Sequence, residues 1–222
     1  MSFQMGNSKG KSQKRFDRKT RRSMILDSAA ELIAEEGVAQ LSLESIGQKA
    51  NVSKTLMYRY FGSQIELLRE LLDREYDSLR DQQAVAAENA ETYEDLVRNV
   101  TRAYLSYIEE RGLIIEKLQA YPNISNKQDP THYRREAAVS YLAKLVSDSF
   151  DIPMDMAIAC TDISFGLPAS AGDFLLRSKM DRQKIEDLTV AMMMGGMMGV
   201  RYDVSVAGAK LKRPTLPKKK GG

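Results

Sequence analysis

The stretch NVSKTLMYRYF, residues 51–61, combines apolar, cationic, hydroxyl-bearing and aromatic side chains in one short segment. In a helix, successive residues turn by about 100°. The cationic and hydroxyl-bearing side chains, together with one tyrosine, then fall on one arc: Lys54, Thr55, Tyr58 and Arg59. The apolar side chains fall on the opposite arc: Leu56, Met57 and Phe61. One face of this helix is therefore predicted to pack against the protein and the other to stay exposed.

The exposed arc has the chemistry of a surface that reads DNA. Arginine can bind guanine edges or phosphates, lysine binds phosphates, and hydroxyl groups bind either. The alternative is an ordinary solvated helix face, although such faces are richer in mixtures of Glu and Lys. We interpret the segment as a recognition helix.

The residues before it predict further short helices. Asn51 suits the positive φ of a tight turn between two helices, and Ser53 can cap the helix that follows. Ser42 can cap the preceding helix, which is expected to end near Ala50. Gly37 is expected to end a first helix that begins at residue 18. Short helices joined by a tight turn are the layout of a helix-turn-helix domain.

The middle of the chain is also expected to be helical. Ser63 and Glu66 form an S-x-x-E capping box for a fourth helix that should run past residue 81. Thr92 and Asp95 should open a helix that continues to about residue 110. Gly112 is predicted to break it, with a short helix and then a loop following.

Proline marks the boundaries of the later helices. Asp129 and Pro130 supply a cap and a first position for a helix reaching about residue 149. Pro153 should open another helix, broken or kinked around residues 166–168 because proline cannot donate to the preceding turn. A last helix is expected over residues 181–202. Since no segment alternates in polarity for long enough to predict a strand, the fold class is all-α.

Charge is segregated along the chain, although the net charge is only +3. Residues 1–63 hold 11 Lys and Arg against 6 Asp and Glu, residues 64–206 hold 16 against 24, and residues 207–222 hold 6 against none. Clustered cations bind polyanions through counterion release. The basic first quarter therefore predicts nucleic-acid affinity, whereas the basic C-terminal run is also typical of a solvated tail.

Residues 19–72, above all LSLESIGQKANVSKTLMYRYFGSQIELLRELL, resemble the N-terminal domain of the TetR family of bacterial transcriptional regulators. The matching positions are a hydroxyl that opens the second helix, an Ile-x-x-x-Ala stripe, a Val-Ser-Lys turn, two aromatic residues and a Leu-Leu pair: Ser42, Ile46, Ala50, Val52, Ser53, Lys54, Tyr58, Phe61, Leu67 and Leu68. The resemblance implies an N-terminal three-helix helix-turn-helix DNA-binding domain. A long helix should join it to a larger α-helical dimerisation and ligand-binding domain.

The resemblance also implies a set of DNA contacts. The third helix should enter the major groove, one tyrosine should bind phosphate, and basic residues at the start of the first helix should reach phosphates or the minor groove. The expected contacts are Arg21, Arg22, Ser42, Ser53, Lys54, Thr55, Tyr58, Arg59, Tyr60 and Gln64. The sequence departs from the family pattern where Asn51 replaces a common glycine, Tyr60 a frequent histidine and Gln64 a frequent lysine.

Four segments are predicted along the chain. They are a basic disordered arm over residues 1–17, the helix-turn-helix domain over 18–76, the helical effector-binding and dimerisation domain over 77–206, and a basic disordered tail over 207–222. Both end segments are rich in lysine and lack the apolar periodicity that would bury a core.

For the larger domain the resemblance implies dimerisation and binding of a small molecule, for which an apolar pocket with a few hydroxyls favours a hydrophobic effector. The candidate effector contacts, each of which could equally fill a core, are Tyr104, Tyr107, Ile108, Tyr141, Met156, Cys160 and Phe165. The candidate dimer contacts are Phe174, Leu175, Met192, Gly195 and Gly199. The run AMMMGGMMGV could alternatively be a sulfur-rich metal or cofactor box, but methionines at helical spacing are commonly core or interface.

The predicted function is a sequence-specific DNA-binding transcriptional regulator: a homodimeric repressor that a small hydrophobic effector releases from a palindromic operator in double-stranded DNA. An architectural or partner-binding helical protein without effector control is the alternative. An enzyme is not expected, since His132 is the sole histidine and Cys160 the sole cysteine, and no catalytic motif accompanies them. No cofactor, metal or membrane partner is predicted, and the expected location is the cytoplasm, in association with the nucleoid.

Overall fold

The computed structural model describes residues 17–124 and 130–201, and every regular element within these ranges is a helix. The elements are α1 (Arg18–Glu36), the 3₁₀ turn η1 (Val38–Gln40), α2 (Leu43–Lys49), α3 (Lys54–Tyr60), α4 (Gln64–Glu88), α5 (Tyr93–Gln119), α6 (Pro130–Phe150), α7 (Met154–Ser164), α8 (Gly166–Arg177) and α9 (Arg182–Arg201). The all-α prediction is confirmed. The expected arm up to residue 16, the Asp129 cap, the end of the last helix at residue 202 and the tail lie outside the described residues.

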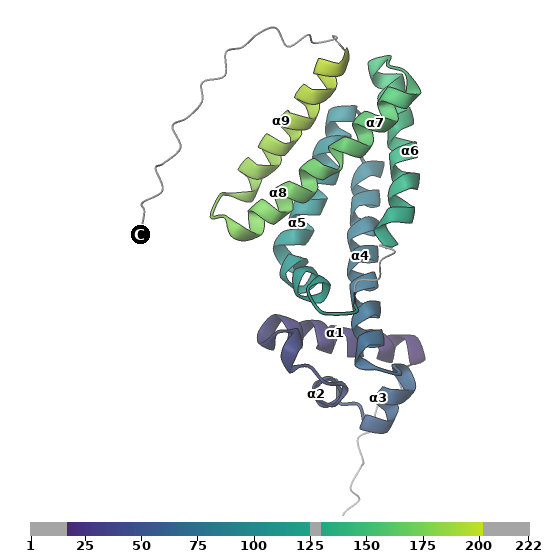
Figure 1. Ribbon diagram of the computed structural model, residues 1–222, viewed down its shortest axis with the longest axis vertical. Helices are drawn as coiled ribbons and strands as arrows, with labels where there is room; N and C mark the ends of the chain where they lie inside the picture. The colour runs from purple at the N-terminus through teal and green to yellow at the C-terminus, as the bar shows by residue number, and fades with distance from the viewer. Residues whose placement is uncertain (1–16, 125–129, 202–222) are drawn as a thin grey trace, which may run out of the picture.

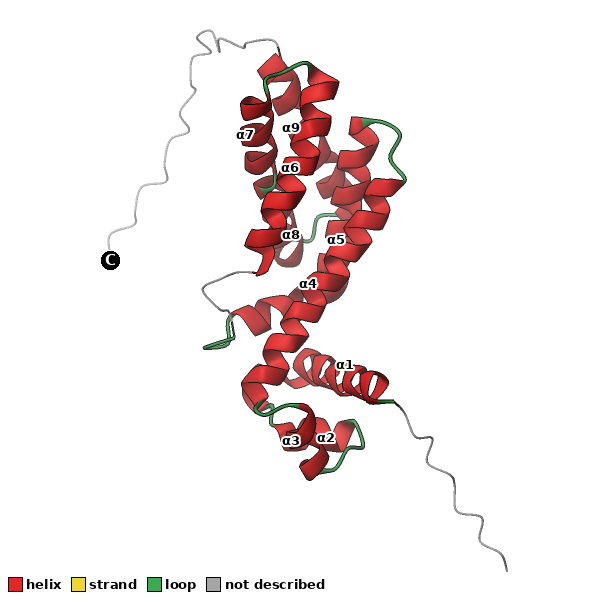
Figure 2. Ribbon diagram, turned by 90° about the vertical axis from the view of Figure 1, so that its right-hand side faces the viewer, coloured by secondary structure: helices red, strands yellow, loops and turns green. Residues whose placement is uncertain are grey.

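The helices form two tiers joined by α4. In Figure 1, α1, α2 and α3 lie together at the lower end, and α4 rises from them alongside α5, with α6 on one side and α8 and α9 on the other. α5 packs against α4, α8 and α9 and also reaches α1, while α6 packs on α7 and α8 on α9. Figure 2 shows α1 crossing the lower part of α4. α4 is therefore the helix that takes part in both tiers.

The predicted caps of the lower tier are present. Ser42 accepts a hydrogen bond from the Ser45 amide, and Ser53 and Ser63 cap α3 and α4 in the same way. Asn51 has φ +52°, the left-handed conformation expected for the turn before α3. These are local effects of side chain and backbone, which is why the sequence predicts them correctly.

Gly47 in α2 permits a close approach that the sequence analysis did not anticipate. A Cβ atom at this position would lie 2.9 Å from the carbonyl oxygen of Val52 and 2.9 Å from Cγ of Met57. The Val52 amide also donates to the Gly47 carbonyl at 2.8 Å. The turn before α3 therefore packs directly against α2 at Gly47, which has no side chain.

Gly112 does not break the helix that contains it, so that prediction is wrong. α5 runs unbroken from Tyr93 to Gln119, and Gly112 is buried within it. A Cβ atom there would lie 3.0 Å from Cδ1 of Leu176, in α8. The cost of a glycine inside a helix, about 1 kcal/mol relative to alanine, is outweighed here by close packing of α5 on α8.

The predictions for the later helices are largely confirmed. Pro153 is the N-cap of α7, and the helix is interrupted at Phe165, which ends α7 and precedes α8. Asp181 accepts a hydrogen bond from the Lys184 amide at the start of α9. Pro168 lies in the first turn of α8, where the missing amide hydrogen costs nothing.

A buried charge network fastens α4 to α5. The side chain of Glu75, 3% exposed, accepts hydrogen bonds from Arg111 at 2.6 Å and 2.8 Å and from the Tyr107 hydroxyl at 2.8 Å. Burial alone would raise the pKa of Glu75, but the hydrogen bonds from Arg111 and Tyr107 outweigh it and hold that pKa below its ordinary value. Burial and the bond to Glu75 raise the pKa of Tyr107 to about 12, so its phenol remains a donor.

One hydrophobic core crosses the predicted domain boundary. It includes Leu67, Leu68 and Leu79 of α4 and extends to Ile115 and Leu118 of α5. α4 passes residue 76 without interruption. The division of the chain at residues 76 and 77 therefore remains a prediction about function, while the packing is continuous.

Candidate nucleic-acid interface and effector cavity

The two arcs of the recognition helix are arranged as predicted. Met57 and Phe61 are buried in the core, whereas Tyr58 is 53% exposed. Thr55 and Arg59 are also exposed. Across the described ranges, the side chains of Thr55, Tyr58 and Arg59 make no hydrogen bond to the protein, so their donors remain available to another molecule.

Lys54 is exposed on the same arc but has an acidic neighbour. Its Nζ lies 3.5 Å from the carboxylate of Glu44, in the first turn of α2, and both side chains are more than half exposed. An exposed ion pair of this kind is worth at most about 1 kcal/mol. The pair therefore orients Lys54 without preventing it from turning towards a phosphate.

Arg22, a predicted DNA contact, has its guanidinium bound within the protein, and its contact with DNA remains a prediction. Its guanidinium donates to both carboxylate oxygens of Glu70 in α4 and to the main-chain carbonyl of Tyr60. It also lies 4.4 Å above the ring centroid of Phe61. The hydrogen bonds to Glu70 raise the pKa of Arg22, so it remains cationic. Arg22 joins the start of α1, the end of α3 and α4.

The remaining predicted DNA contacts differ in accessibility. Tyr60 is half-buried against the core, which assigns it to the packed arc. Arg21 and Gln64 are half-buried, and Arg21 already takes part in an interaction within the protein. The hydroxyls of Ser42 and Ser53 are exposed and cap their helices. Tyr60 is therefore the weakest member of the predicted set after Arg22.

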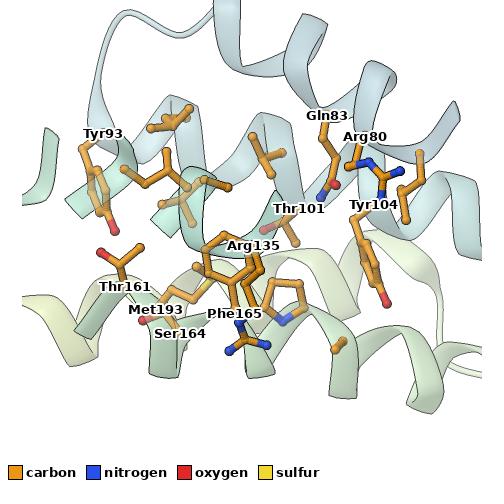
Figure 3. A pocket seen from close by; sticks show the side chains of 18 of the residues that line it. Arg80, Gln83, Tyr93, Thr101, Tyr104, Arg135, Thr161, Ser164, Phe165 and Met193 are labelled. Atoms are coloured by element: carbon orange, nitrogen blue, oxygen red, sulfur yellow. The ribbon is translucent and has the colours of Figure 1, made fainter. Parts of the chain in front are cut away.

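A cavity of about 320 Å³ lies in the upper tier, between α4, α5, α6, α7 and α8, with one residue from α9. Its wall along α5 is a single helical stripe of Tyr93, Leu96, Val97, Val100, Thr101 and Tyr104. The polar groups that line it are Arg80, Gln83, Thr101, Arg135, Thr161 and Ser164, with the tyrosines at positions 76, 93 and 104. Figure 3 shows their side chains gathered around one space. A largely apolar wall with a few polar groups is typical of a small-molecule site.

The cavity contains two of the seven predicted effector contacts, Tyr104 and Phe165. Tyr107 faces Glu75 instead, and Ile108 is buried beside Gly172. Tyr141 and Met156 are exposed, at 65% and 44%. Cys160 is half-buried against a separate core cluster.

Tyr107, Ile108, Tyr141, Met156 and Cys160 do not line this cavity, and their role as effector contacts remains a prediction. The sequence did contain a signal for the missed residues, since the α5 stripe repeats at helical spacing from Tyr93 to Tyr104.

Both arginines of the cavity wall already hold a carboxylate. Arg80 donates to Asp77, one turn earlier on α4. Arg135 donates to the Asp162 carboxylate at 2.9 Å and lies 5.5 Å from the Phe165 ring centroid. Burial raises the pKa of Tyr104 to about 12, so this phenol stays protonated.

Apolar side chains remain exposed on α8 and α9. Phe174, Leu188, Met192 and Met198 are 38–60% exposed, and Gly195 is exposed beside them, with nothing within 4 Å of a Cβ built on it. Gly199 is half-buried. Leu175 is buried within its own chain, against Leu105 and Ile185, and its role as a dimer contact remains a prediction.

Within residues 17–124 and 130–201 no group of three or more His, Cys, Asp or Glu side chains is placed to hold a metal ion. In the same ranges, no helix has both the length and the apolar composition needed to cross a membrane.

The sequence profile of the family described as "Bacterial regulatory proteins, tetR family" matches residues 25–71, from within α1 to within α4. Over these residues the chain is similar to the TetR family. It is 29% identical over 162 residues to the HTH-type transcriptional activator FasR of Mycolicibacterium smegmatis, a match that covers 73% of this chain and 64% of that protein. It is 23% identical over 179 residues to the DNA-binding transcriptional repressor TetR of Mycobacteroides abscessus, covering 78% of this chain and 80% of that one. This chain thus spans a little under two thirds of the length of FasR.

Solved structures share the fold over most of the chain. A TetR-family regulator from Streptomyces coelicolor superposes with a TM-score of 0.67 at 18% identity, over 85% of this chain and 84% of that one. The fatty acid degradation regulator FadR from Bacillus halodurans superposes with a TM-score of 0.58 at 15% identity, over 81% and 96%. The family matched at residues 25–71 and these two relatives are described as transcriptional regulators.

Proposed function

We propose that this protein is a homodimeric repressor that binds a palindromic operator through α3 and leaves it when a small molecule occupies the cavity. One observation carries the proposal: α4 contributes both to the packing of the DNA-binding helices and to the cavity wall. Leu67 and Leu68 at its start are fully buried in the lower core, while Arg80 and Gln83 line the cavity.

The coupling between the two sites is mechanical in this proposal. Arg22 ties the start of α4 to the end of α3 through Glu70 and the Tyr60 carbonyl, so a shift of α4 is passed to the recognition helix. A ligand can shift the equilibrium only as far as its affinity differs between two arrangements of the protein. The cavity ligand must therefore favour a position of α4 that does not fit the operator.

Dimerisation is supported by the exposed apolar face of α8 and α9. Two copies of this face would bury Phe174, Leu188 and Met192 in a four-helix bundle, where Gly195 would allow the helices to approach closely. A two-fold dimer places its two recognition helices on half-sites about 34 to 36 Å apart, one turn of DNA. The operator should then be palindromic.

Repression is the favoured direction of regulation, because a dimer that covers an operator blocks access to it. Among the relatives, FasR is named an activator and TetR of Mycobacteroides abscessus a repressor. A transcription assay on the selected operator separates the two: addition of the protein should lower transcript levels, and a rise would replace repression with activation.

The DNA-binding face is tested by four single variants in gel-shift assays on operators selected from random DNA. Tyr58→Phe and Lys54→Ala should weaken binding to all sequences, because both side chains are expected on phosphates. Arg59→Ala or Thr55→Ala should alter sequence preference, with a loss of about 1 to 3 kcal/mol at the affected base pair. Full operator affinity in all four variants would contradict the assignment of this face.

An architectural protein without sequence reading is the alternative, and it has the same salt dependence as a regulator. Nuclease footprinting distinguishes them. A regulator should protect a defined palindrome, whereas an architectural protein should protect DNA without a reproducible boundary.

A further inference from the structure

The segment that forms α2, α3 and the turns around them contains a single carboxylate. Glu44 is the one acidic residue of residues 37–65, whose other charged residues are Lys49, Lys54 and Arg59. It lies in the first turn of α2, and its side chain is 60% exposed. Figures 1 and 2 both show α2 and α3 at the lower end of the molecule, with α1 between them and the upper tier. Glu44 is thus an exposed negative charge at the end of the molecule that is expected to meet DNA.

Contacts within the protein place the Glu44 carboxylate at the start of the recognition helix. Both of its oxygens lie 3.5 Å from Nζ of Lys54, the first residue of α3. The other lysine of the segment, Lys49, points to α1 instead, where its Nζ lies 2.9 Å from the Glu35 carboxylate. In helix-turn-helix proteins the N-terminal residues of the recognition helix contact base edges. The Glu44 carboxylate will therefore be close to base edges when α3 enters the major groove.

Few groups on DNA can satisfy a carboxylate at this position. An ionised carboxylate only accepts hydrogen bonds, and phosphates offer it no donor and repel its charge. In the major groove the donors are the amino groups of cytosine and adenine. The adenine amino group is flanked by two acceptors, its own N7 and O4 of the paired thymine, whereas the cytosine amino group is flanked by one, O6 of the paired guanine. Cytosine is therefore the base that best fits Glu44.

We propose that Glu44 is a specificity-determining residue that accepts a hydrogen bond from the N4 amino group of a cytosine in each half-site of the operator. Lys54, beside the carboxylate, offsets part of its charge against neighbouring phosphates. On DNA that presents no amino group at this point, the carboxylate loses water without gaining a donor, which weakens binding. This inference rests on the proposed function, since it requires α3 to enter the groove of a defined operator.

The contact is tested by selecting bound sites from random double-stranded DNA with the full chain. The native protein should select a C·G pair at one position of each half-site. Glu44→Gln should select adenine there, because a glutamine amide matches N6 and N7 of adenine, and Glu44→Ala should accept all four base pairs. The rest of the motif should not change. Glu36→Gln, the control, removes the same charge from an exposed position at the end of α1 and should leave the whole motif unchanged.

A modified base tests the contact at the level of one atom. N4-methylcytosine still pairs with guanine, but its methyl group occupies the amino position that faces the major groove. At the selected cytosine of one half-site, this base should lower the affinity of the native protein about tenfold in gel shifts, the usual effect of losing one base contact. The affinity of Glu44→Ala should not change. At a cytosine outside the motif, the same modification should have no effect on either protein.

Two results would overturn this contact alone. One is a defined motif shared by the native protein and both Glu44 variants, which would leave Glu44 only the role of a negative charge at the start of α2, measured as lower stability of the variants in urea. The other is full affinity of the native protein for the N4-methylcytosine operator. A native protein that selects no defined motif would overturn the proposed function, and this contact with it, so the two failures are distinguishable.

Discussion

At the scale of single residues, two arginines of the N-terminal region, Arg22 and Arg59, have different roles. Arg59 is exposed on α3 with no partner among the described residues, whereas Arg22 donates to Glu70 and to the Tyr60 carbonyl. Their side chains carry the same charge. The carboxylate of Glu70 on another helix decides which of the two is withdrawn from solvent.

Arg22→Met should therefore act on folding and not on phosphate contacts. Glu70 would lose its partner while half-buried, which we expect to cost about 1 kcal/mol of unfolding free energy, measured in urea. The slope of log affinity against log salt should stay unchanged. Arg18→Met, at an exposed position of the same helix, serves as the control for stability. A slope reduced by about 0.9 with unaltered stability would restore Arg22 to the DNA-binding set.

At the scale of the elements, close contacts between helices occur where glycine removes the side chain. Gly47 lets the turn before α3 fold onto α2, and Gly112 lets α5 pack on α8. Neither glycine has a positive φ. Their role is to give room to a neighbour, which a local reading of helix propensity cannot detect.

Gly47→Ala should destabilise the DNA-binding helices by about 1 to 3 kcal/mol, because the added methyl group would meet a main-chain oxygen that cannot easily move. Operator affinity should fall with it. Gly166→Ala is the matched control in α8, where nothing lies within 4 Å of the new Cβ atom. That change should be neutral or stabilise by up to about 1 kcal/mol. Equal stability of the two variants in thermal unfolding would contradict the close-approach argument.

The network that joins α4 and α5 predicts a pH dependence. In the native protein the pKa of Glu75 is lowered below its reference value of 4.5, so the folded state binds fewer protons than the unfolded state. Its contribution to stability is present above the unfolded pKa and is lost as pH falls through the folded pKa.

Arg111→Met should reverse that sign, because burial without the guanidinium raises the pKa of Glu75. The loss at pH 7 should be about 3 kcal/mol, at the lower end for a broken buried pair since Arg111 is partly exposed. The difference from the native protein should shrink as pH falls from 7 towards 4.5. Arg69→Met, which loses only a bond to a main-chain carbonyl, should show a difference that does not vary with pH. A constant difference for Arg111→Met would refute the linkage.

At the scale of the whole molecule, the exposed face of α8 and α9 should determine the oligomeric state. Met192, 60% exposed, is expected at the centre of the dimer surface. Met192→Lys would bring like charges together across the two-fold axis, and should convert the dimer to a monomer and lower operator affinity by at least tenfold. Val85→Lys places the same charge at a 60% exposed position on α4 and should leave the dimer intact. Sedimentation velocity measures both, and a dimeric Met192→Lys protein would remove this face from the interface.

The sequence by itself determined the local structure of this protein. The caps at Ser42, Ser53 and Ser63, the left-handed Asn51 and the two arcs of α3 depend on side chains and main chain a few residues apart. The family motif lies in the same region, so fold class and DNA-binding function could be predicted together. Local interactions are sufficient to predict these features because each contact joins residues within one turn or one helix.

Only the tertiary structure decided which residues face the cavity, the partner helix or solvent. Tyr104 and Tyr107 are three residues apart on α5, yet one lines the cavity and the other bonds Glu75. An apolar pattern shows that a helix face is buried but not what covers it. The packing of α4, α6, α7 and α8 around α5 determines what covers each face, and it places Arg80 and Thr161 in the cavity wall. The packing of α1 against α4 likewise places Arg22 beside Glu70.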